Sequence, residues 1–394
     1  MEPLFAFTPV EEIEQRIRRI QSEMAIEGID ALLVTSNTNI YYTTGRVING
    51  YVYIPVNGQA VYFIRRPAGI EGDNVIYIHK PEQILEKIKG AGISSPRIMG
   101  YELGALDCMT FDRLAKAFSG VTAFNATPLL RRVRAVKSAY ELEKLRESGV
   151  KHERVYRRIP HIYHEGMTDI ELQIEIERVS RLEGCLGQFR IAGESMELFM
   201  SNILAGDNAD VPTPYDFAMG GRGLDPSLPV GADGTVIKAG MSVMVDSNGN
   251  FTGYMTDMTR VYSLTELDDL ARRAHQCSID ICHRLEKEGR PGIAASLLYE
   301  IAVDMVKERD LERYFMGHNQ KAGFIGHGVG IEINELPVIA PRSRDILALN
   351  NVIAIEPKFV IPHVGAVGIE NTYVVTDDGL KSLTNAPEEI VSLL

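Results

Sequence analysis

Five residues in the C-terminal part of the chain combine a metal-binding side chain with a sequence context that indicates a metal ligand. They are Asp246 and Asp257 in VMVDSNGNFTGYMTDMTRVY, His327 in GFIGHGVGIEINELP, Glu356 in VIAIEPKF and Glu370 in AVGIENTYVV. Four carboxylates and one imidazole are enough to hold two divalent cations close together. Such a pair can deprotonate a water molecule that bridges it, so the set predicts metal-assisted hydrolysis.

The sequence context of each residue indicates how strongly it should be considered a ligand. Asp257 lies inside a strand-like run, where a bare carboxylate is disfavoured and a cation is its strongest partner. His327 stands between two glycines, which let the backbone approach closely and free the imidazole to point into a site. Glu356 and Glu370 each follow a short apolar run, and a glutamate ending a buried strand is rarely without a partner. Asp246 alone could equally be a turn residue, so the five signals gain their weight together.

Composition limits the class of protein. The chain has 394 residues, 45% of them hydrophobic and 24% charged, which indicates a globular protein of two domains. The formal net charge of −12 argues against nucleic acid or an anionic membrane as the main partner. The sequence has no apolar run of about 18 residues, and the acidic N-terminus lacks the apolar region of a signal peptide. We therefore expect no membrane span and a cytoplasmic location, and we expect the four cysteines, which show no CxxC spacing, to be free thiols.

The first part of the chain alternates between helix and strand patterns. Apolar residues at helical spacing predict a helix over residues 10–28, and DALLVT then predicts a buried strand. A polar turn is expected at Ser36 and Asn37, before further short strand-like runs and a helix near residues 108–118. This alternation predicts an α/β domain over residues 1–130.

The second part begins with a charged helical stretch over residues 131–160, and residues 168–171 form a capping box for the next helix. A Gly- and Pro-rich loop is expected at residues 205–234. MSVMVD and FTGYMTDMTRVYSL predict a hairpin that turns at SNGN, because Asn-Gly is a strong turn signal. Two helices and three strand regions complete the expected order, at 264–289, 292–311, 325–333, 351–361 and 366–376.

The order and the local sequences of these motifs resemble those of the pita-bread metallohydrolases, which include prolidase, aminopeptidase P, methionine aminopeptidase and the metal-free creatinase. The matching segments are DSNGNFTGYMTDMTR, GHGVGIEINELP, IEP and IENT, and SNTNIYYTTG resembles the start of a creatinase-type N-terminal domain. The resemblance implies an α/β N-terminal domain over residues 1–130 and an α+β pita-bread domain over residues 131–394. Homodimers are usual for this family.

By this resemblance, Asp246 binds one metal, Asp257 and Glu370 bridge both, and His327 and Glu356 complete the other site. The implied cofactors are two divalent ions, and mixed oxygen and nitrogen ligands accept Mn, Co, Zn or Fe. A metal-bridged hydroxide attacks an amide carbonyl of a small peptide or small-molecule amide, and Glu356 is the catalytic base. Arg260 matches the family's sequence motif, and we expect it to be a structural charge partner beside the carboxylates.

The chain departs from the family at the histidines that peptidases add around the metals. It has no histidine between residues 164 and 275, and our alignment places Pro229 at the upstream position. Gly323 and Asn334 stand at the other two positions, and Gly368 replaces an arginine that often precedes the last Ile-Glu. The amide of Asn334 can donate a hydrogen bond but cannot carry a proton, so we predict a substrate-binding role for Asn334.

Two other histidines could compensate for the missing ones. His363 lies between Glu356 and Glu370 in sequence and is predicted to bind substrate. His318 precedes the Gly-His-Gly segment. For both residues, an ordinary surface loop position is the alternative interpretation.

Three functions are compatible with the sequence. The first is a metal-dependent hydrolase that resembles Xaa-Pro dipeptidase or aminopeptidase P. The second is a creatinase-like C–N hydrolase or lyase that acts on a small non-peptide substrate, which the missing histidines favour. The third is a binding module without activity, and the retention of four clustered carboxylates argues against it.

Overall fold

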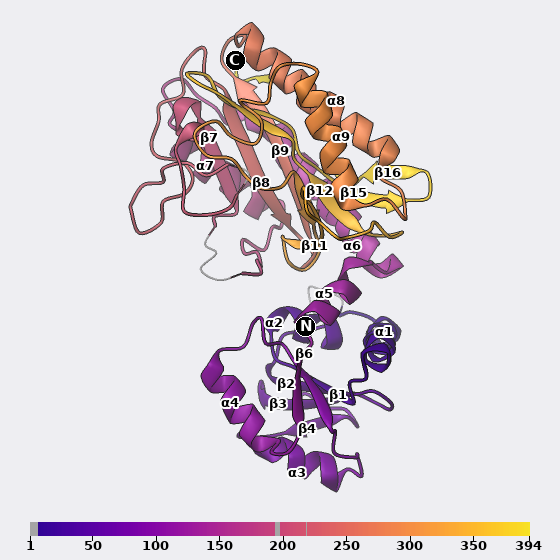
Figure 1. Ribbon diagram of the computed structural model, residues 1–394. Coiled ribbons are helices and arrows are strands. Elements are labelled where there is room, and N and C mark those ends of the chain that lie inside the picture. Colours follow the sequence, from indigo (N-terminus) through magenta and orange to yellow (C-terminus); the bar gives the residue numbers. More distant parts are fainter. Residues whose placement is uncertain (1–6, 194–197, 218) are drawn as a thin grey trace. The chain divides into compact units, whose positions relative to one another are not determined.

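The chain is described from a computed structural model, which covers residues 7–193, 198–217 and 219–394 (Figure 1). It divides into two compact units, Met1–Arg134 and Ala135–Leu394. The boundary that we predict between residues 130 and 131 falls within helix α5 (Thr127–Ala135). No helix within the described ranges is long and apolar enough to cross a membrane.

The first unit is built on one mixed sheet of six strands in the order β4-β3-β2-β1-β5-β6. The strands are β1 (Ala31–Val34), β2 (Asn49–Pro55), β3 (Val61–Arg66), β4 (Val75–Tyr77), β5 (Ile98–Tyr101) and β6 (Thr122–Asn125). The helices before α5 are α1 (Val10–Glu27), α2 (Asn37–Thr44), α3 (Gln83–Gly90) and α4 (Cys108–Ala117). Apolar residues of α3 and α4 pack against β1, β3 and β5 in one buried cluster, which confirms the expected α/β architecture.

Two predictions for this unit have different outcomes. The helix expected over residues 10–28 is confirmed as α1, which ends at Gly28 with φ of 71°. The turn expected at Ser36 and Asn37 is wrong, because Ser36 caps helix α2 instead. Its hydroxyl accepts a hydrogen bond from the backbone N–H of Asn39 at 3.3 Å, and serine is a favoured residue at a helix N-cap.

The second unit contains four α-helices, two short 3-10 helices and eleven strands within the described residues. The helices are α6 (Ala139–Arg158), η1 (Ile159–His161), α7 (Asp169–Leu182), η2 (Gly206–Asp210), α8 (Asp269–Glu288) and α9 (Ala295–Lys307). The strands are β7 (Ser201–Ala205), β8 (Val243–Asn250), β9 (Met255–Ser263), β10 (Gly326–Gly328), β11 (Glu335–Ile339), β12 (Val352–Ile355), β13 (Lys358–Ile361), β14 (Gly365–Gly368), β15 (Asn371–Thr376), β16 (Gly379–Ser382) and β17 (Val391–Ser392). The capping box predicted for α7 is confirmed.

These strands form two larger sheets and a hairpin. One sheet has the order β17-β9-β8-β7 and packs against α6 and α7 in one apolar cluster. The other has the order β11-β10-β12-β15-β16, and together with the β13-β14 hairpin it packs against α8 and α9 (Figure 1). An isolated bridge between Thr259 on β9 and Glu370, next to β15, joins the two sheets. Each sheet therefore has helices on one face and the opposing sheet near the other, as expected for an α+β pita-bread domain.

The predicted turn at SNGN is wrong, because β8 continues through Gly249 to Asn250 and the chain turns at residues 251–254. The reason is close packing at Gly249. A Cβ there would lie 2.6 Å from Nδ1 of His152 and 2.6 Å from Oγ1 of Thr256, so only glycine fits against α6. Gly249 therefore allows α6 to pack closely on β8 and does not form a turn.

Candidate metal centre

The structure brings all five predicted metal ligands together between the two sheets of the second unit. Asp246 lies on β8 and Asp257 on β9, where Asp246 pairs with Thr259. His327 is the central residue of β10, Glu356 follows β12 directly, and Glu370 precedes β15. The alternation of side chains along a strand places Asp257 and Thr259 on the same face of β9. Segments separated by more than a hundred residues thus meet at one point.

Glu370 is held from several directions. Its backbone pairs with that of Thr259, whose hydroxyl donates a hydrogen bond of 2.8 Å to Oε2 of Glu370. The guanidinium of Arg260 donates to the carbonyl oxygen of Glu370 at 2.8 Å. Helix α8 fixes the preceding residues, because Nδ1 of His275 accepts from the N–H of Gly368 and the hydroxyl of Ser278 accepts from the N–H of Ile369. These bonds fix the direction of the carboxylate without using its Oε1.

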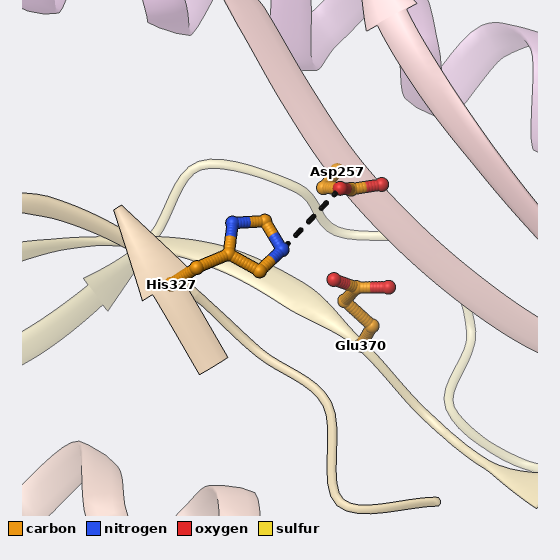
Figure 2. Close-up of side chains that lie close together, drawn as sticks. All are labelled: Asp257, His327 and Glu370. Carbon is orange, nitrogen blue, oxygen red and sulfur yellow. Dashed lines mark ion pairs between the residues drawn. The ribbon is translucent and has the colours of Figure 1, made fainter. Parts of the chain in front are cut away.

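His327 presents a free lone pair to the carboxylates. Its Nδ1 lies 3.1 Å from the carbonyl oxygen of Gly328, so Nδ1 carries the proton and Nε2 does not. Nε2 lies 3.8 Å from Oδ2 of Asp257 (Figure 2). It also lies 3.6 Å from Oε1 of Glu356. These distances exceed a hydrogen bond, but two ligand atoms around one ion, each about 2.1 Å from it, are about 3 to 4 Å apart.

One position between these side chains fits a cation. Asp257, His327 and Glu370 each offer a ligand atom within 4.8 Å of the others, and the three side chains point toward one another (Figure 2). Oε1 of Glu370 is buried and has no hydrogen-bond partner among the described residues. A buried carboxylate oxygen without a partner is costly, and a divalent ion would satisfy it. One imidazole and several carboxylates suit Mn, Co, Zn or Fe.

A second group of carboxylates already contains a cation from the protein, which the sequence analysis missed. The ammonium nitrogen of Lys358 lies 2.8 Å from Oδ2 of Asp246, 2.7 Å from Oε2 of Glu356 and 3.2 Å from Oε2 of Glu370. Its side chain is completely buried at the start of β13. The available signal was a lysine directly before the apolar residues Phe359, Val360 and Ile361, in a segment expected to be a buried strand. Lysine is almost never fully buried without a charged partner.

The cluster contains four carboxyl groups but one ammonium, so the charges balance only if some of the acids hold protons or another cation binds. Burial and the charges of Glu370, Asp246 and Glu356 raise the pKa of Asp257 well above its usual range. Burial and the charge of Glu356 raise the pKa of Glu370 to about 8. Burial lowers the pKa of Lys358, but the three carboxylates around it outweigh this effect, and its pKa lies well above the ordinary value. Lys358 is therefore charged, and the acids still lack positive charge on the side of His327.

Asn334 lies outside this cluster of contacts. Its Nδ2 donates to the carbonyl oxygen of Ala192 at 2.6 Å, and its Oδ1 accepts from the N–H of Ala192 at 2.7 Å. The amide group thus bonds to the backbone at both ends, and its substrate-binding role stays a prediction. Pro229 and Gly323, at the other two positions, have no side-chain group that can donate a hydrogen bond.

The other two histidines bond to aspartates away from the metal ligands. His363 is in the turn of the β13-β14 hairpin, with 91% of its side chain exposed, and pairs with Asp207 at 3.4 Å. Strands of four residues put this turn about 14 Å from the carboxylate end of the hairpin. His318 pairs with Asp210 at 2.9 Å. The structure does not bring His363 to the metal ligands, and its substrate-binding role stays a prediction.

Arg260 is buried and structural, as expected, although its partners differ from those expected. Its guanidinium donates to the carbonyl oxygens of Thr259, Glu370 and Ala386 and to Oδ1 of Asn371, rather than to a carboxylate. The bonds to Glu370 and Asn371 tie β9 to the segment that carries Glu370. Arg260 therefore positions the backbone of a ligand without neutralising its charge.

Comparison with known proteins agrees with this geometry. Residues 143–377 match the metallopeptidase family M24, and residues 16–136 match the creatinase/prolidase N-terminal domain. The chain belongs to metallopeptidase family M24. The M24 match includes all five predicted ligands and Lys358. Membership supports a metal-dependent peptidase, and the relatives described next give no better support to the creatinase-like alternative.

Two relatives of the M24 chain are named for dipeptidase activity. It is 24% identical to the Xaa-Pro dipeptidase of Pyrococcus horikoshii, with 96% of this chain and 99% of the relative covered. It is 29% identical to the probable dipeptidase PepE of Mycobacterium bovis, over 69% of this chain and 64% of that protein. Among solved structures, the Xaa-Pro dipeptidase of Bacillus anthracis has a TM-score of 0.79 at 21% identity, covering 96% of this chain and 99% of that chain. The M24 chain therefore has the prolidase fold.

Proposed function

We propose that this M24 protein is a metal-dependent peptidase that binds a divalent ion with Asp257, His327, Glu356 and Glu370. The observation that carries the proposal is the buried Oε1 of Glu370, which has no partner within the described part of the chain. It accompanies an imidazole whose Nε2 lone pair faces two carboxylates at 3.6 and 3.8 Å. A divalent cation would satisfy these ligand atoms and offset the negative charge of the carboxylates.

The residues around the ion would divide the chemistry between them. A divalent ion supplies a Lewis acid that polarises a carbonyl group and lowers the pKa of a water molecule. Glu356 has one oxygen on Lys358 and the other toward His327, so it can accept a proton while its position stays fixed. Thr259 and Arg260 hold Glu370 so that it does not reorient during turnover.

The names of the relatives suggest the class of substrate. Two of them are Xaa-Pro dipeptidases, so we propose a small peptide or related small amide as substrate. Pro229, Gly323 and Asn334 stand where we place the accessory histidines of such peptidases. Loss of one oxyanion-type donor commonly lowers kcat by about 10²–10³, so we expect weak turnover of Xaa-Pro dipeptides. A cytoplasmic homodimer and the identity of the metal stay predictions.

The test is a metal-reconstituted activity assay. The protein is freed of metal with a chelator, reloaded separately with Mn, Co, Zn or Fe, and incubated with a panel of Xaa-Pro and other dipeptides. Peptide-bond hydrolysis that requires metal and disappears in Asp257→Asn supports the proposal. The control is Asp304→Asn, because Asp304 pairs with Lys307 on the surface of α9. Full metal loading without cleavage of any dipeptide would instead favour the creatinase-like C–N hydrolase or lyase.

A further inference from the structure

The buried ammonium of Lys358 occupies a position of its own within the carboxylate cluster. Asp246, Glu356 and Glu370 each offer an oxygen within 4.8 Å of the others, a spacing that suits one metal ion. The ammonium nitrogen is within hydrogen-bond distance of all three carboxylates, at 2.7 to 3.2 Å. A metal ion bound by the same oxygens would lie about 2.0–2.2 Å from each of them, which leaves no space for the ammonium.

We propose that Lys358 fills one of two neighbouring cation positions with its own ammonium group, so that the chain binds at most one divalent ion. That ion binds on the other side of the carboxylates, with Asp257, His327, Glu356 and Glu370. The inference deepens the proposed function and rests on it, because it states how many metal ions the peptidase site holds. It replaces the two-ion site that the resemblance implies.

The two glutamates show this division oxygen by oxygen. Glu356 directs Oε2 to the ammonium at 2.7 Å and Oε1 toward Nε2 of His327 at 3.6 Å. Glu370 directs Oε2 to the ammonium and to Thr259, while its buried Oε1 has no partner in the described ranges. Each glutamate thus has one oxygen satisfied by Lys358 and the other available for an ion. Two cation positions exist side by side, and one is taken.

The backbone opposite Lys358 is adapted to this arrangement. Gly368 pairs with Lys358 across the β13-β14 hairpin and has φ of 128°. A Cβ at Gly368 would lie 3.0 Å from Cα of Lys358 and 2.8 Å from the carbonyl oxygen of Pro357. A larger residue would therefore displace the strand that carries the ammonium. The absence of the family's arginine at residue 368 and the presence of lysine at residue 358 belong to the same local structure.

Charge balance is consistent with a single ion. When ionised, the four acids carry four negative charges, and the ammonium neutralises one of them. A divalent ion beside His327 neutralises two more. A fixed ammonium is not a Lewis acid and cannot lower the pKa of a water molecule as a metal does. Lys358 therefore supplies charge and position, and the chemistry depends on the ion beside His327.

The experiment compares metal content between wild type and Lys358→Ala. Both proteins are stripped with chelator, dialysed against excess Mn²⁺, freed of unbound ion and measured by inductively coupled plasma mass spectrometry. Removal of the ammonium opens the second position, so Lys358→Ala is expected to bind one more ion per chain than wild type. The matched control is Lys381→Ala, an exposed lysine on β16, which is expected to keep the wild-type count.

The outcomes separate this inference from the proposed function. The difference between Lys358→Ala and wild type tests the inference, whereas the wild-type count tests whether a metal binds at all. Two ions per wild-type chain, or equal counts in the two proteins, would overturn the inference. If Lys358→Ala does not fold, Lys358→Ser takes its place, because its short hydroxyl can still donate to a carboxylate. Electron paramagnetic resonance provides a second readout, and a spin-coupled Mn pair in wild type would contradict the proposal.

Discussion

The ammonium nitrogen of Lys358 lies 2.7 Å from Oε2 of Glu356, two residues earlier in the chain. Pro357 separates them, and the chain crosses from β12 to β13 at this point. The metal ligand and the internal cation therefore belong to one short segment. Substitution of either Glu356 or Lys358 therefore removes a charge next to the other residue.

Replacement of Lys358 by methionine should destabilise the metal-free protein. Removal of one partner from a buried ion pair commonly costs about 3–5 kcal/mol. The pKa of Glu370 is about 8 with Lys358 present, and loss of the ammonium, which lowers this pKa, raises it further. At pH 5.5 the carboxylates can take up protons to relieve their repulsion, whereas at pH 8 the folded variant must either hold them ionised without the ammonium or keep protons that the unfolded chain has released. The loss of stability caused by Lys358→Met should therefore grow with pH.

The measurement is urea unfolding in chelator at pH 5.5 and pH 8, with Lys381→Met as the exposed control. A destabilisation by Lys358→Met that is equal at both pH values would show that the carboxylates do not carry the charge assigned to them.

Acid should destabilise the protein through His275. Burial lowers the pKa of His275 to about 4 and outweighs the hydrogen bond to the carbonyl oxygen of Glu388, which favours the charged ring. In the neutral ring, Nδ1 accepts from the N–H of Gly368 and Nε2 donates to that carbonyl oxygen. The unfolded chain, with a histidine pKa of about 6.5, takes up a proton first. Stability is therefore complete above about pH 6.5 and is lost as pH falls toward 4, by up to about 3 kcal/mol for this residue.

In His275→Gln, the slope of unfolding free energy against pH should be smaller between pH 6.5 and 4. The control is His363→Gln, which changes an exposed histidine in a turn. An unchanged slope in His275→Gln would mean that this ring is not held neutral.

Thr259→Val should weaken metal binding without unfolding the protein. Valine has nearly the shape of threonine but cannot donate the 2.8 Å hydrogen bond to Oε2 of Glu370. Loss of a residue that orients a metal ligand commonly reduces metal affinity by about 10–100-fold. Competition with a fluorescent chelator measures this affinity, with the exposed Thr122→Val as control. Equal affinity would show that Glu370 does not need this bond to reach the ion.

Gly249→Ala should destabilise the second unit by about 1–3 kcal/mol, because the added Cβ would meet His152 and Thr256 at 2.6 Å. Gly90→Ala is the matched control, since a Cβ there meets no atom within 4 Å. Thermal unfolding compares the two variants. A tolerated Gly249→Ala would mean that α6 does not pack as closely on β8 as the structure shows.

The sequence was most informative where a residue contradicted its surroundings. Asp257 in a strand-like run and Glu370 after apolar residues led directly to the cluster, because buried charges require partners. Lys358 satisfies the same criterion and was missed, since its partners include Asp246, which is 112 residues away. Proximity of that kind depends on how the two sheets face each other, which no local pattern reports.

Local patterns failed where long-range packing decided the conformation. The Asn-Gly pair at residues 248–249 is a strong turn signal, yet Gly249 is extended because His152 packs on it. Ser36 was expected in a turn, and the structure uses it to begin a helix. The capping box before α7 succeeded because its hydrogen bonds form within four consecutive residues and need no distant partner.

The most direct test of the account is a crystal structure grown with Mn²⁺ and measured for anomalous scattering. We expect one anomalous peak per chain, bounded by Asp257, His327, Glu356 and Glu370, with the side chain of Lys358 still between Asp246 and Glu356. Two peaks with Lys358 displaced, or no peak beside His327 at saturating Mn²⁺, would contradict it.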